Sequence, residues 1–495
     1  MFGNICGTFP ADFSKNKTLV TGSHTDSVKN GGQFDGPVGV YMSLKSAENF
    51  KNSSKKQYGN LKTIIYACEE SERFHKACLG SFYLSGELSY EQLANLTDEN
   101  GITFADAVAE YKDYIFSHLA EYGIDLNNIE LVDKVISEAD ITEAIEAHIE
   151  QSEILSASDI PIGIVDSIGK PLRGTISVSG NTPIVTSAKI ISYLNELSLK
   201  SKTDDAEESL RITVPQFDTK STLDNAELVT SDGSDLLKIR AIGETNHSGA
   251  TPMDKRKDAV LGMSSLILKL DELSKQNPNI HFDFLGSVSE KWGANQIPNN
   301  SNLILRVTPS ASAGIVKSFA EEIEEDGKVS FEISPTTWEI VQANPFTKLF
   351  VDIRQQYPAK GIHTRETVYD MFKDILHQDS AKSDSISFKI SSIGDPVPTS
   401  SELLDNVKEI CQEKKYPCQV MHSWPGHDLA CVLSNKNKTG KKILFFIPSE
   451  GGSHNPKEIT SKEAILIGTD VYTTLVSQRM NKFKEEYEKN SDLSL

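Results

Sequence analysis

The stretch GSHTDSVKNGGQFDGPVGV, residues 22–40, joins a strand pattern to a helix pattern. The apolar run before it, LVTGSH at 19–24, reads as a short buried strand. Residues 38–50 (VGVYMSLKSAENF) have helical spacing, and the loop between is rich in Gly, Asn and Asp, which favour turns. A second apolar run, LKTIIYAC at 61–68, ends at Glu69-Glu70. This strand–helix–strand order predicts an α/β domain with a mainly parallel sheet.

Polar residues follow both predicted strands. In parallel sheets, ligands bind at the carboxyl ends of the strands. His24 and the pair Glu69-Glu70 stand just past such ends, which makes them candidate site residues. Further along the chain we expect helices at 102–121 and 141–151.

A different succession of elements occupies the middle of the chain. Strands are expected at 236–245, 302–307 and 328–342, with helices at 255–275 and 314–325. A β-α-β-α-β succession of this length indicates a smaller inserted α+β domain. The first domain then resumes with helices at 400–414 and 461–484 on either side of a strand in KKILFFIPSEGGSHNP, 441–456.

We therefore predict three segments. Residues 1–171 form the first part of the α/β domain, 172–344 the inserted domain, and 345–495 the second part of the α/β domain. Residues 172–235 form an extra segment of the insertion, with a polar stretch at 198–210. Residues 347–398 are predicted to be irregular. No internal repeat is apparent in the sequence.

The composition is that of a globular protein with an acidic surface. Of the 495 residues, 38% are hydrophobic and 24% charged, and the net charge is −20. Such a charge disfavours nucleic acid and anionic membranes as partners. The chain has no apolar run approaching the roughly 20 residues that span a bilayer, and its start lacks the pattern of a signal peptide. Six scattered cysteines without a C-x-x-C motif favour reduced thiols and a cytoplasmic location.

The candidate residues suit a site for two metal ions. Divalent ions take imidazole and carboxylate ligands, and one carboxylate can bridge two ions. Asp26 follows His24 closely enough to orient its imidazole, and Asp35 lies in a Gly-rich turn. Of the adjacent Glu69 and Glu70, one can bind metal while the other remains a free base. Taken singly each signal is weak, and spacing alone does not decide between Glu69 and Glu70.

Long motifs in a fixed order carry a family resemblance. Residues 22–40 closely resemble the first metal motif of the peptidase M20-type amidase/hydantoinase/carbamoylase family, which includes N-carbamoyl-L-amino-acid hydrolases, β-ureidopropionases and allantoate amidohydrolases. Further resemblances are EESERF (69–74) to E-E-G-S-R-F, EAHIEQSEIL (146–155) to L-H-I-E-Q-G, and GETNHSGATPMDKRKDA (243–259) to G-x-x-N-H-A-G-T-T-P-M-D-x-R-x-D-A. NQIP (295–298), PGHD (425–428) and GGSHNPKEIT (451–460) match later motifs, so the resemblance runs from about residue 5 to the C-terminal helix.

The resemblance implies a metal-binding role for five residues. His24, Asp35 and His148 would hold one ion, and Asp35, Glu70 and His454 the second, with Asp35 bridging. Zn²⁺ or Mn²⁺ is expected, and Co²⁺ or Ni²⁺ also suits these ligands. Glu69 would be the general base that activates the attacking water and then protonates the leaving nitrogen.

The resemblance also implies a substrate site and an assembly. Gln151, Asn295, Gly426 and His427 would contact a small-molecule substrate. His247, in the inserted domain with Asn295, would polarise the scissile carbonyl. Family members are usually dimers through the lid domain, so a homodimer is implied.

Three features depart from the family pattern. The family has a D-x-R motif whose Arg binds a substrate carboxylate. In this chain the Asp position is Arg306 and the Arg position is Thr308. Either Arg306, on the same strand face, replaces the family Arg, or the substrate lacks that carboxylate. Trp424 and Pro425 replace small residues and should narrow the pocket. The segment MFGNICGTFPADF stands at the start of this chain, whereas the family reaches it only after several tens of residues.

We therefore expect a binuclear metal-dependent hydrolase that cleaves a linear C–N bond of an amide, ureide or N-carbamoyl compound with metal-activated water. The alternatives are an M20 aminoacylase or dipeptidase-type peptidase and a catalytically inactive paralogue acting as a binding partner. The adjacent glutamates in EESERF and the H-I-E-Q sequence favour the carbamoylase branch.

Overall fold

A computed structural model of the chain divides into two compact units. The first comprises Met1–Gly169 with Pro396–Leu495, and the second Lys170–Asp395. The residues described are 3–14, 16–52, 56–74, 76–98, 100–119, 121–125, 129, 136–137, 140–201, 210–219, 228–230, 236–289, 295–336, 338–340, 346–355, 384–392, 396–433 and 440–492.

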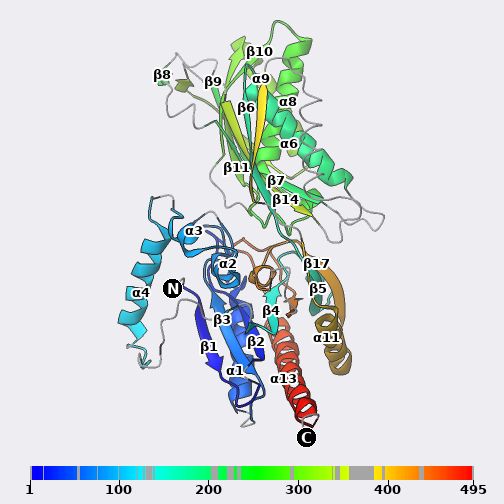
Figure 1. Cartoon of the computed structure of the whole chain (residues 1–495). Helices are drawn as coiled ribbons and strands as arrows, with labels where there is room; N and C mark the ends of the chain where they lie inside the picture. The colour runs from blue at the N-terminus through cyan, green and yellow to red at the C-terminus, as the bar shows by residue number, and fades with distance from the viewer. Residues whose placement is uncertain are drawn as a thin grey trace. The chain divides into compact units, whose positions relative to one another are not determined.

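The first unit is built on a mixed, mostly parallel eight-stranded sheet (Figure 1). Its order is β1 (Ile5–Phe9), β3 (Asn60–Tyr66), β2 (Thr18–His24), β4 (Glu143–Ile149), β18 (Lys441–Ile447), β5 (Ile162–Ile168) and β16 (Val397–Pro398), with β17 (Cys418–Ser423) also pairing with β5. Strands β3, β2, β4 and β18 are consecutive neighbours and mutually parallel. The predicted α/β class is confirmed.

Helices cover both faces of this sheet. Helices α1 (Pro37–Asn52), α11 (Ser401–Lys414) and α13 (Lys462–Asp492) share one core cluster, and α2 (Leu79–Ser85) and α12 (Asp428–Cys431) share another. Leu19 and Val20, successive residues of β2, belong to different clusters because strand side chains alternate between faces. The shorter elements are α3 (Tyr90–Ala94), α4 (Phe104–Leu119) and α5 (Ile154–Ala157).

The helix predicted at 141–151 is wrong, because Glu143–Ile149 is the central strand β4. Its Glu and Ala residues favour a helix locally, but pairing with β2 and β18 overrides this preference. All seven residues of β4 are buried, and its polar side chains have partners. Glu143 binds Arg479 of α13, and Glu146 accepts hydrogen bonds from the Ser23 hydroxyl and the Leu429 backbone N–H.

The second unit is a larger α+β structure than the sequence predicted. Its eight-stranded antiparallel sheet has the order β12 (Ser330–Pro335), β9 (Leu236–Ile242), β11 (Asn300–Thr308), β10 (His281–Ser289), β7 (Leu210–Asp218), β14 (Phe346–Gln355), β6 (Leu172–Ser179) and β15 (Ser385–Ser392). Its helices are α6 (Pro183–Lys200), α8 (Ala259–Gln276) and α9 (Ala313–Glu324), with η3 (Met253–Lys255) and η4 (Ser310–Ser312). A separate two-stranded sheet joins β8 (Leu228–Thr230) to β13 (Trp338–Ile340).

The insertion also extends further along the chain than residue 344. Strands β14 and β15 fall in the stretch 347–398 that was expected to be irregular, yet both pair with β6 in the sheet of the second unit. The strands and helices predicted between 236 and 325 are present, and β10, which was not predicted, lies among them. The single strand predicted at 328–342 is instead two strands, β12 and β13, which belong to different sheets. Residues 356–383 lie outside the described residues.

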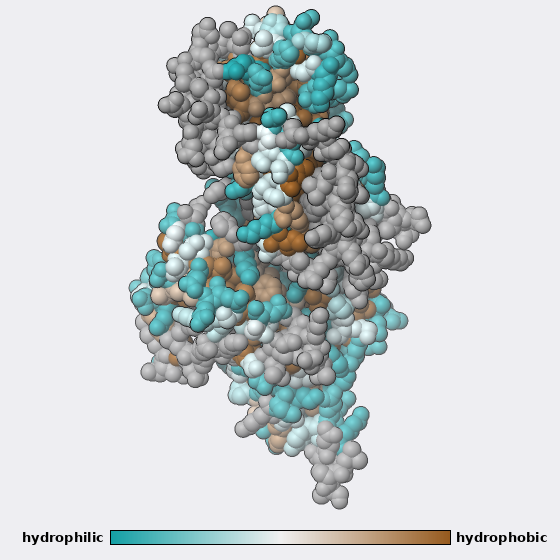
Figure 2. All heavy atoms as spheres, turned by 45° about the horizontal axis from the view of Figure 1, so that its top comes forward, coloured by the Kyte–Doolittle hydropathy of each residue, from teal (hydrophilic) through white to brown (hydrophobic). Residues whose placement is uncertain are grey.

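Within the described chain, no helix combines the length and apolar character needed to cross a membrane. On the face drawn in Figure 2, hydrophilic and hydrophobic residues are interspersed.

The ion pair between α13 and β4 gives a test of the first unit. In Arg479→Met, Glu143 would lose the guanidinium that now lies 2.7 Å from it (Nε to Oε2) and remain a buried charge. We expect the free energy of unfolding to fall by about 3–5 kcal/mol, measured by urea denaturation. The half-exposed pair Arg240–Glu332 is the matched control, and Arg240→Met should change stability little. Equal losses of stability in the two variants would contradict a special contribution from the buried pair.

Candidate metal centre

The candidate ligands converge because four neighbouring strands end at one edge of the first sheet. His24 is the last residue of β2, and His148 is the next-to-last residue of β4. Glu69 and Glu70 follow β3, and His454 lies in the loop after β18. Since these strands are parallel neighbours, their carboxyl ends lie side by side.

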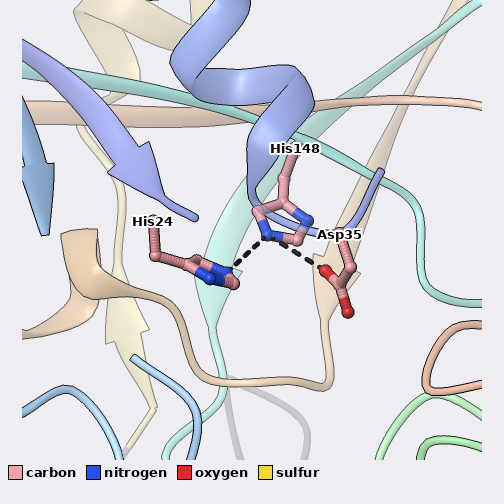
Figure 3. A group of neighbouring side chains, drawn as sticks. All are labelled: His24, Asp35 and His148. Atoms are coloured by element: carbon pink, nitrogen blue, oxygen red, sulfur yellow. Dashed lines mark hydrogen bonds and ion pairs between the residues drawn. The ribbon is translucent and has the colours of Figure 1, made fainter. Parts of the chain in front are cut away.

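His24, Asp35 and His148 form the first group of side chains that could hold a metal ion. Their polar atoms point toward one another (Figure 3): His148 Nε2 lies 3.3 Å from His24 Nε2 and 3.1 Å from Asp35 Oδ1. All three side chains are buried. The arrangement places two imidazole nitrogens and one carboxylate oxygen around a common point.

Asp35, Glu70 and His454 form the second group, which shares Asp35 with the first. His454 Nε2 lies 2.9 Å from Glu70 Oε1 and 3.3 Å from Asp35 Oδ2. The two oxygens of Asp35 therefore face different groups, Oδ1 toward His148 and Oδ2 toward His454. A carboxylate in this position is suited to bridging two ions.

Several neighbours hold the Asp35 carboxylate in place. The Gln151 side-chain amide donates to both oxygens, at 2.9 and 2.8 Å, and the Ser453 hydroxyl donates to Oδ2. The backbone N–H groups of Phe34 and Asp35 donate to Glu458 Oε1, at 2.9 and 3.1 Å. Glu458 thereby ties the Asp35 loop to the segment that follows His454.

Two backbone features bring ligands close together. Gly36 has φ +86°, and a Cβ at this residue would lie 2.4 Å from the His24 ring, so the close approach of the loop requires glycine. His454 has φ +59°, a left-handed backbone conformation that is uncommon for residues other than glycine. Such strained residues cluster at functional sites.

Asp26 lies beside His24, as predicted, but its closest contact is made by its backbone. The carbonyl oxygen of Asp26 is 3.0 Å from His24 Nδ1, and its carboxylate is 3.6 Å away. That carboxylate instead accepts the backbone N–H groups of Glu69 and Glu70, at 3.2 and 2.9 Å. Asp26 thus links the His24 ligand to the glutamate pair.

Glu69 has the environment of a proton-transfer group. It is buried, its Oε2 lies 3.9 Å from His24 Nε2, and the Cys78 thiol donates to Oε1. Burial, opposed by His24 and reinforced by Glu70, raises the pKa of Glu69 well above its usual value. A carboxylate whose pKa is raised is a stronger base, which suits it to accept a proton from water.

The histidine pKa values differ according to their neighbours. Burial lowers the pKa of His454, but Glu70 and Asp35 more than offset this and raise it to about 10. Burial also opposes protonation of His24, yet its contact with Asp26 and the charge of Glu69 raise its pKa well above the usual value. Burial lowers the pKa of His148 despite the nearby Asp35.

These residues fit two divalent cations. Three imidazoles and two carboxylates converge in a buried site, and burying several carboxylates together is costly unless positive charge compensates them. Nitrogen and oxygen donors of this kind are ligands for Zn²⁺, Mn²⁺, Co²⁺ and Ni²⁺. The ligand roles themselves remain a prediction.

The family comparison agrees with this geometry. Residues 20–478 match the family described as Peptidase family M20/M25/M40, which is more than nine-tenths of the chain. The chain belongs to this M20 family. The match spans both units and includes all five candidate ligands.

Individual M20 relatives are distant but cover nearly the whole chain. The N-carbamoyl-L-amino-acid amidohydrolase of Pseudomonas sp. is 23% identical over 95% of this chain and 83% of its own length. The allantoate amidohydrolase of Bacillus subtilis is 23% identical over 96% and 84%. The crystal structure of an amidase of the hydantoinase/carbamoylase family from Burkholderia multivorans aligns with a TM-score of 0.51 at 19% identity, over 97% of this chain and 85% of that chain. This structural likeness shows the fold alone.

The predicted substrate residues of the first unit lie close to the candidate metal ligands. Gln151 hydrogen-bonds both Asp35 oxygens, and the His427 ring packs edge-on against His148 with ring centroids 4.6 Å apart. His427 Nε2 is 3.0 Å from the Ser423 hydroxyl. Gly426 is half-buried next to His427, and the neighbouring Trp424 is buried with its ring against His422.

His247 and Asn295 belong to the second unit, where the structure brings them together. The Ser248 N–H donates to the Asn295 carbonyl, and His247 pairs with Gln296 in an isolated bridge. His247 Nδ1 accepts the backbone N–H groups of Gly249 and Ala250, both at 3.0 Å. An accepting Nδ1 leaves the proton on Nε2 in the neutral ring, so Nε2 is a hydrogen-bond donor.

Sequence reasoning missed three residues that contact the centre. Ser453 and Glu458, which hold Asp35, both lie in the motif GGSHNPKEIT, where only His454 was assigned a role. Their positions next to a predicted ligand were an available signal. Cys78 approaches Glu69 only through the tertiary fold, since backbone bonds from Cys78 and Leu79 to Glu69 and Cys68 close the loop between them.

The shared carboxylate predicts the metal stoichiometry. We expect two ions per chain in the wild type and about one in His454→Ala, because that change removes a ligand from the second group alone. Metal content of protein dialysed after loading with Mn²⁺ or Zn²⁺ measures this directly. His118→Ala, at an exposed histidine of α4, is the matched control and should retain both ions. Two tightly bound ions in His454→Ala would remove His454 from the ligand set.

The raised pKa of His454 predicts coupling between metal and protons. The metal-free protein keeps the His454 proton until about pH 10, so ion binding near neutrality must release it. Apparent metal affinity should therefore rise between about pH 6 and pH 8, with protons released on binding. Calorimetric titration in buffers of different ionisation enthalpy measures this release. A binding enthalpy independent of the buffer would contradict it.

Proposed function

We propose that this chain is a binuclear metal-dependent hydrolase that cleaves a linear C–N bond of a small amide, ureide or N-carbamoyl compound. The observation that carries the proposal is the pair of ligand groups that share Asp35 beside the buried carboxyl of Glu69. His24, Asp35 and His148 would hold one ion, and Asp35, Glu70 and His454 the other. Zn²⁺ or Mn²⁺ is proposed, and Co²⁺ or Ni²⁺ also suits the donors.

When bound, the two ions would lower the pKa of the attacking water and stabilise negative charge on the substrate oxygen. Glu69 takes the proton from that water, because it is close to the ligands but belongs to neither group. Its raised pKa keeps the acquired proton available for the leaving nitrogen. Asp26 fixes the backbone of Glu69 and so limits its position during both transfers.

In the second unit, His247 is proposed to donate its Nε2–H to the scissile carbonyl. The two backbone donors at Nδ1 support this role, since they select the tautomer with the proton on Nε2. A neutral imidazole donor can stabilise developing negative charge without first losing a proton. Asn295 adjoins His247 and is proposed to bind substrate beside it, as Gln151, Gly426 and His427 do in the first unit.

The substrate class is supported by the names of the relatives. An N-carbamoyl-L-amino-acid amidohydrolase and an allantoate amidohydrolase each align with about 95% of the chain. We propose that this chain acts on a compound of the same chemical kind. All six cysteines are free thiols, which supports the cytoplasmic location expected from the sequence.

Replacing Glu69 separates metal binding from catalysis. Glu69→Gln should bind both ions yet lose turnover by about 100- to 10,000-fold, because the amide cannot accept the proton. Metal content and product release are measured on the same sample. The control is Glu72→Gln in the same loop, which should keep its activity. Near-normal turnover in Glu69→Gln would remove Glu69 from the base role.

Product release from a substrate panel tests the function itself. Wild-type protein loaded with Mn²⁺ or Zn²⁺ is given N-carbamoyl amino acids, allantoate, N-acyl amino acids and dipeptides, each with a neutral amide counterpart where one exists. Turnover of the first two classes is expected. Turnover of N-acyl amino acids or dipeptides alone would instead assign an aminoacylase or peptidase, and silence with both ions bound would favour an inactive binding partner.

A further inference from the structure

The second unit contains two sets of elements in the same order. The first copy consists of β6, α6, β7, β14 and β15, and the second copy of β9, α8, β10, β11, α9 and β12. Helices α6 and α8 both have 18 residues, and strands β7 and β10 both have nine. The stretch between β14 and β15, where a counterpart of α9 would lie, is outside the described residues.

Strand pairing follows the same rule in both copies. Strand β6 pairs with β14 and β15, as β9 pairs with β11 and β12, and β7 pairs with β14, as β10 pairs with β11. Both hairpins have a register shift at corresponding points, opposite Phe350–Asp352 and Ile304–Leu305. Equivalent strands of the two copies therefore follow in the same order from the two edges of the sheet toward its middle: β12, β9, β11, β10 from one edge and β15, β6, β14, β7 from the other.

The copies meet through equivalent elements. Strand β7 lies antiparallel to β10, with Asp218 opposite Val288, and α6 packs against α8 on one face of the sheet (Figure 1). A single hydrophobic cluster extends through both copies. Contact between like elements is the mark of a two-fold, isologous interface, which normally forms between two identical subunits.

The second copy is inserted within the first. It lies between β7 and β14, which are hairpin partners in the first copy as β10 and β11 are in the second. The chain enters and leaves the second copy through the paired strands β8 and β13, where Leu228 lies opposite Ile340. Because its two ends lie side by side, a complete copy fits into one loop of the other.

The two copies differ at the positions where substrate-binding residues are expected. Between β9 and α8 a long loop carries His247, whereas β6 and α6 are joined by Gly180–Thr182 alone. Near the ends of β14 and β11, the first copy has Asp352 and Arg354 where the second has Arg306 and Thr308. The register supports this equivalence, since Arg354 faces the start of β7 and Thr308 the start of β10.

Arg354 is buried and held in a fixed orientation. Its Nε and Nη2 lie 3.0 and 3.1 Å from the two oxygens of Asp352. Its Nη1 faces the His247 loop, since a Cβ on Gly249 would lie 2.9 Å from Arg354 Nη1 and 3.1 Å from His247 Cε1. In contrast, Arg306 is one-third exposed and lies 3.9 Å from Asp283.

Reciprocal bonds join the two copies at this point. Arg211 of the first copy donates to the carbonyl oxygens of Gly249 and Ala250, both at 2.7 Å. Arg256 of the second copy donates to the Ile212 carbonyl and the Thr213 hydroxyl of the first, at 3.1 and 2.6 Å. The loop that carries His247 is thus positioned by strand β7 of the other copy.

We propose that the second unit reproduces a two-fold dimer interface within one chain, and that its two copies share one substrate-binding face. At this face, Arg354 of the first copy binds a carboxylate of the substrate, and His247 of the second copy binds the carbonyl of the substrate. A fixed guanidinium is suited to a carboxylate. The ligand class is therefore an N-carbamoyl or ureido acid, which rests on the function proposed above. The homodimer implied by the resemblance is then not needed to complete this interface, because β10 and α8 already pair with β7 and α6 of the same chain.

The oligomeric state tests the internal pairing independently of activity. Light scattering after size exclusion, from nanomolar to micromolar protein, should give one species with the mass of a single chain, 54.5 kDa. Any specific activity should be unchanged on dilution. A stable dimer whose activity falls as it dissociates would overturn the internal pairing, whether or not the substrate has been identified.

Binding of N-carbamoylglycine and of its neutral amide tests Arg354. Binding is measured by calorimetry on metal-loaded Glu69→Gln protein, which should not turn the ligand over. This protein is compared with variants that carry one further substitution: Arg354→Met, Arg354→Lys, Arg306→Met or Arg240→Met. Arg354→Met should weaken binding of the acid by about 10- to 100-fold and leave the amide unaffected. Arg240→Met is the matched control on β9 and should have no effect.

Arg354→Lys keeps the charge beside Asp352 but lacks the planar fork, so it should remain folded and bind the acid more weakly than wild type. Its melting temperature and mass identify any folding defect. Unchanged acid binding in both Arg354 variants, or a selective loss in Arg306→Met instead, would overturn the assignment. Failure of the background protein to bind either ligand, with a single-chain mass retained, would count against the proposed substrate and not against the pairing.

Discussion

In the first unit, one buried carboxylate, that of Asp35, belongs to both groups of candidate metal ligands. Asp35 presents one oxygen toward His148 and the other toward His454, and a carboxylate buried without such partners would be costly. To meet this requirement, β2, β4 and β18 must be adjacent and end at the same edge. The turn before α1 must also approach His24 so closely that only Gly36 fits. Sheet order, loop conformation and ligand positions are therefore parts of one constraint.

The sequence predicted those parts of the centre that local motifs carry. His24, Asp35 and Glu70 lie within or next to recognisable strand ends, and His454 lies in its own Gly-rich motif, so the structure needed only to bring the motifs together. Local propensity failed at β4, where helix-favouring residues form a central strand because Arg479 and neighbouring strands satisfy its buried glutamates. Contacts such as that of Cys78 with Glu69 depend on loop closure and had no signal in the sequence.

The repeat in the second unit was not detectable in the sequence for two physical reasons. A sheet covered by helices on one face requires apolar residues at suitable intervals, not particular side chains, so two copies can share a topology with little residue identity. The second copy also interrupts the first between β7 and β14, so corresponding segments do not follow one another along the chain. The extra segment 172–235 and the segment 347–398 that was expected to be irregular contain the strands of the first copy.

This duplication explains one departure from the family pattern, Thr308 in place of an arginine. In a symmetric dimer every interface residue occurs twice, so each must serve both sites. Here the two copies belong to one chain, and among the described residues both metal-ligand groups lie in the first unit. The two copies therefore need not carry the same residues at equivalent positions. The second copy can therefore carry Thr308 in place of an arginine, and the first can dispense with the histidine loop, without loss to the face formed by Arg354 and His247.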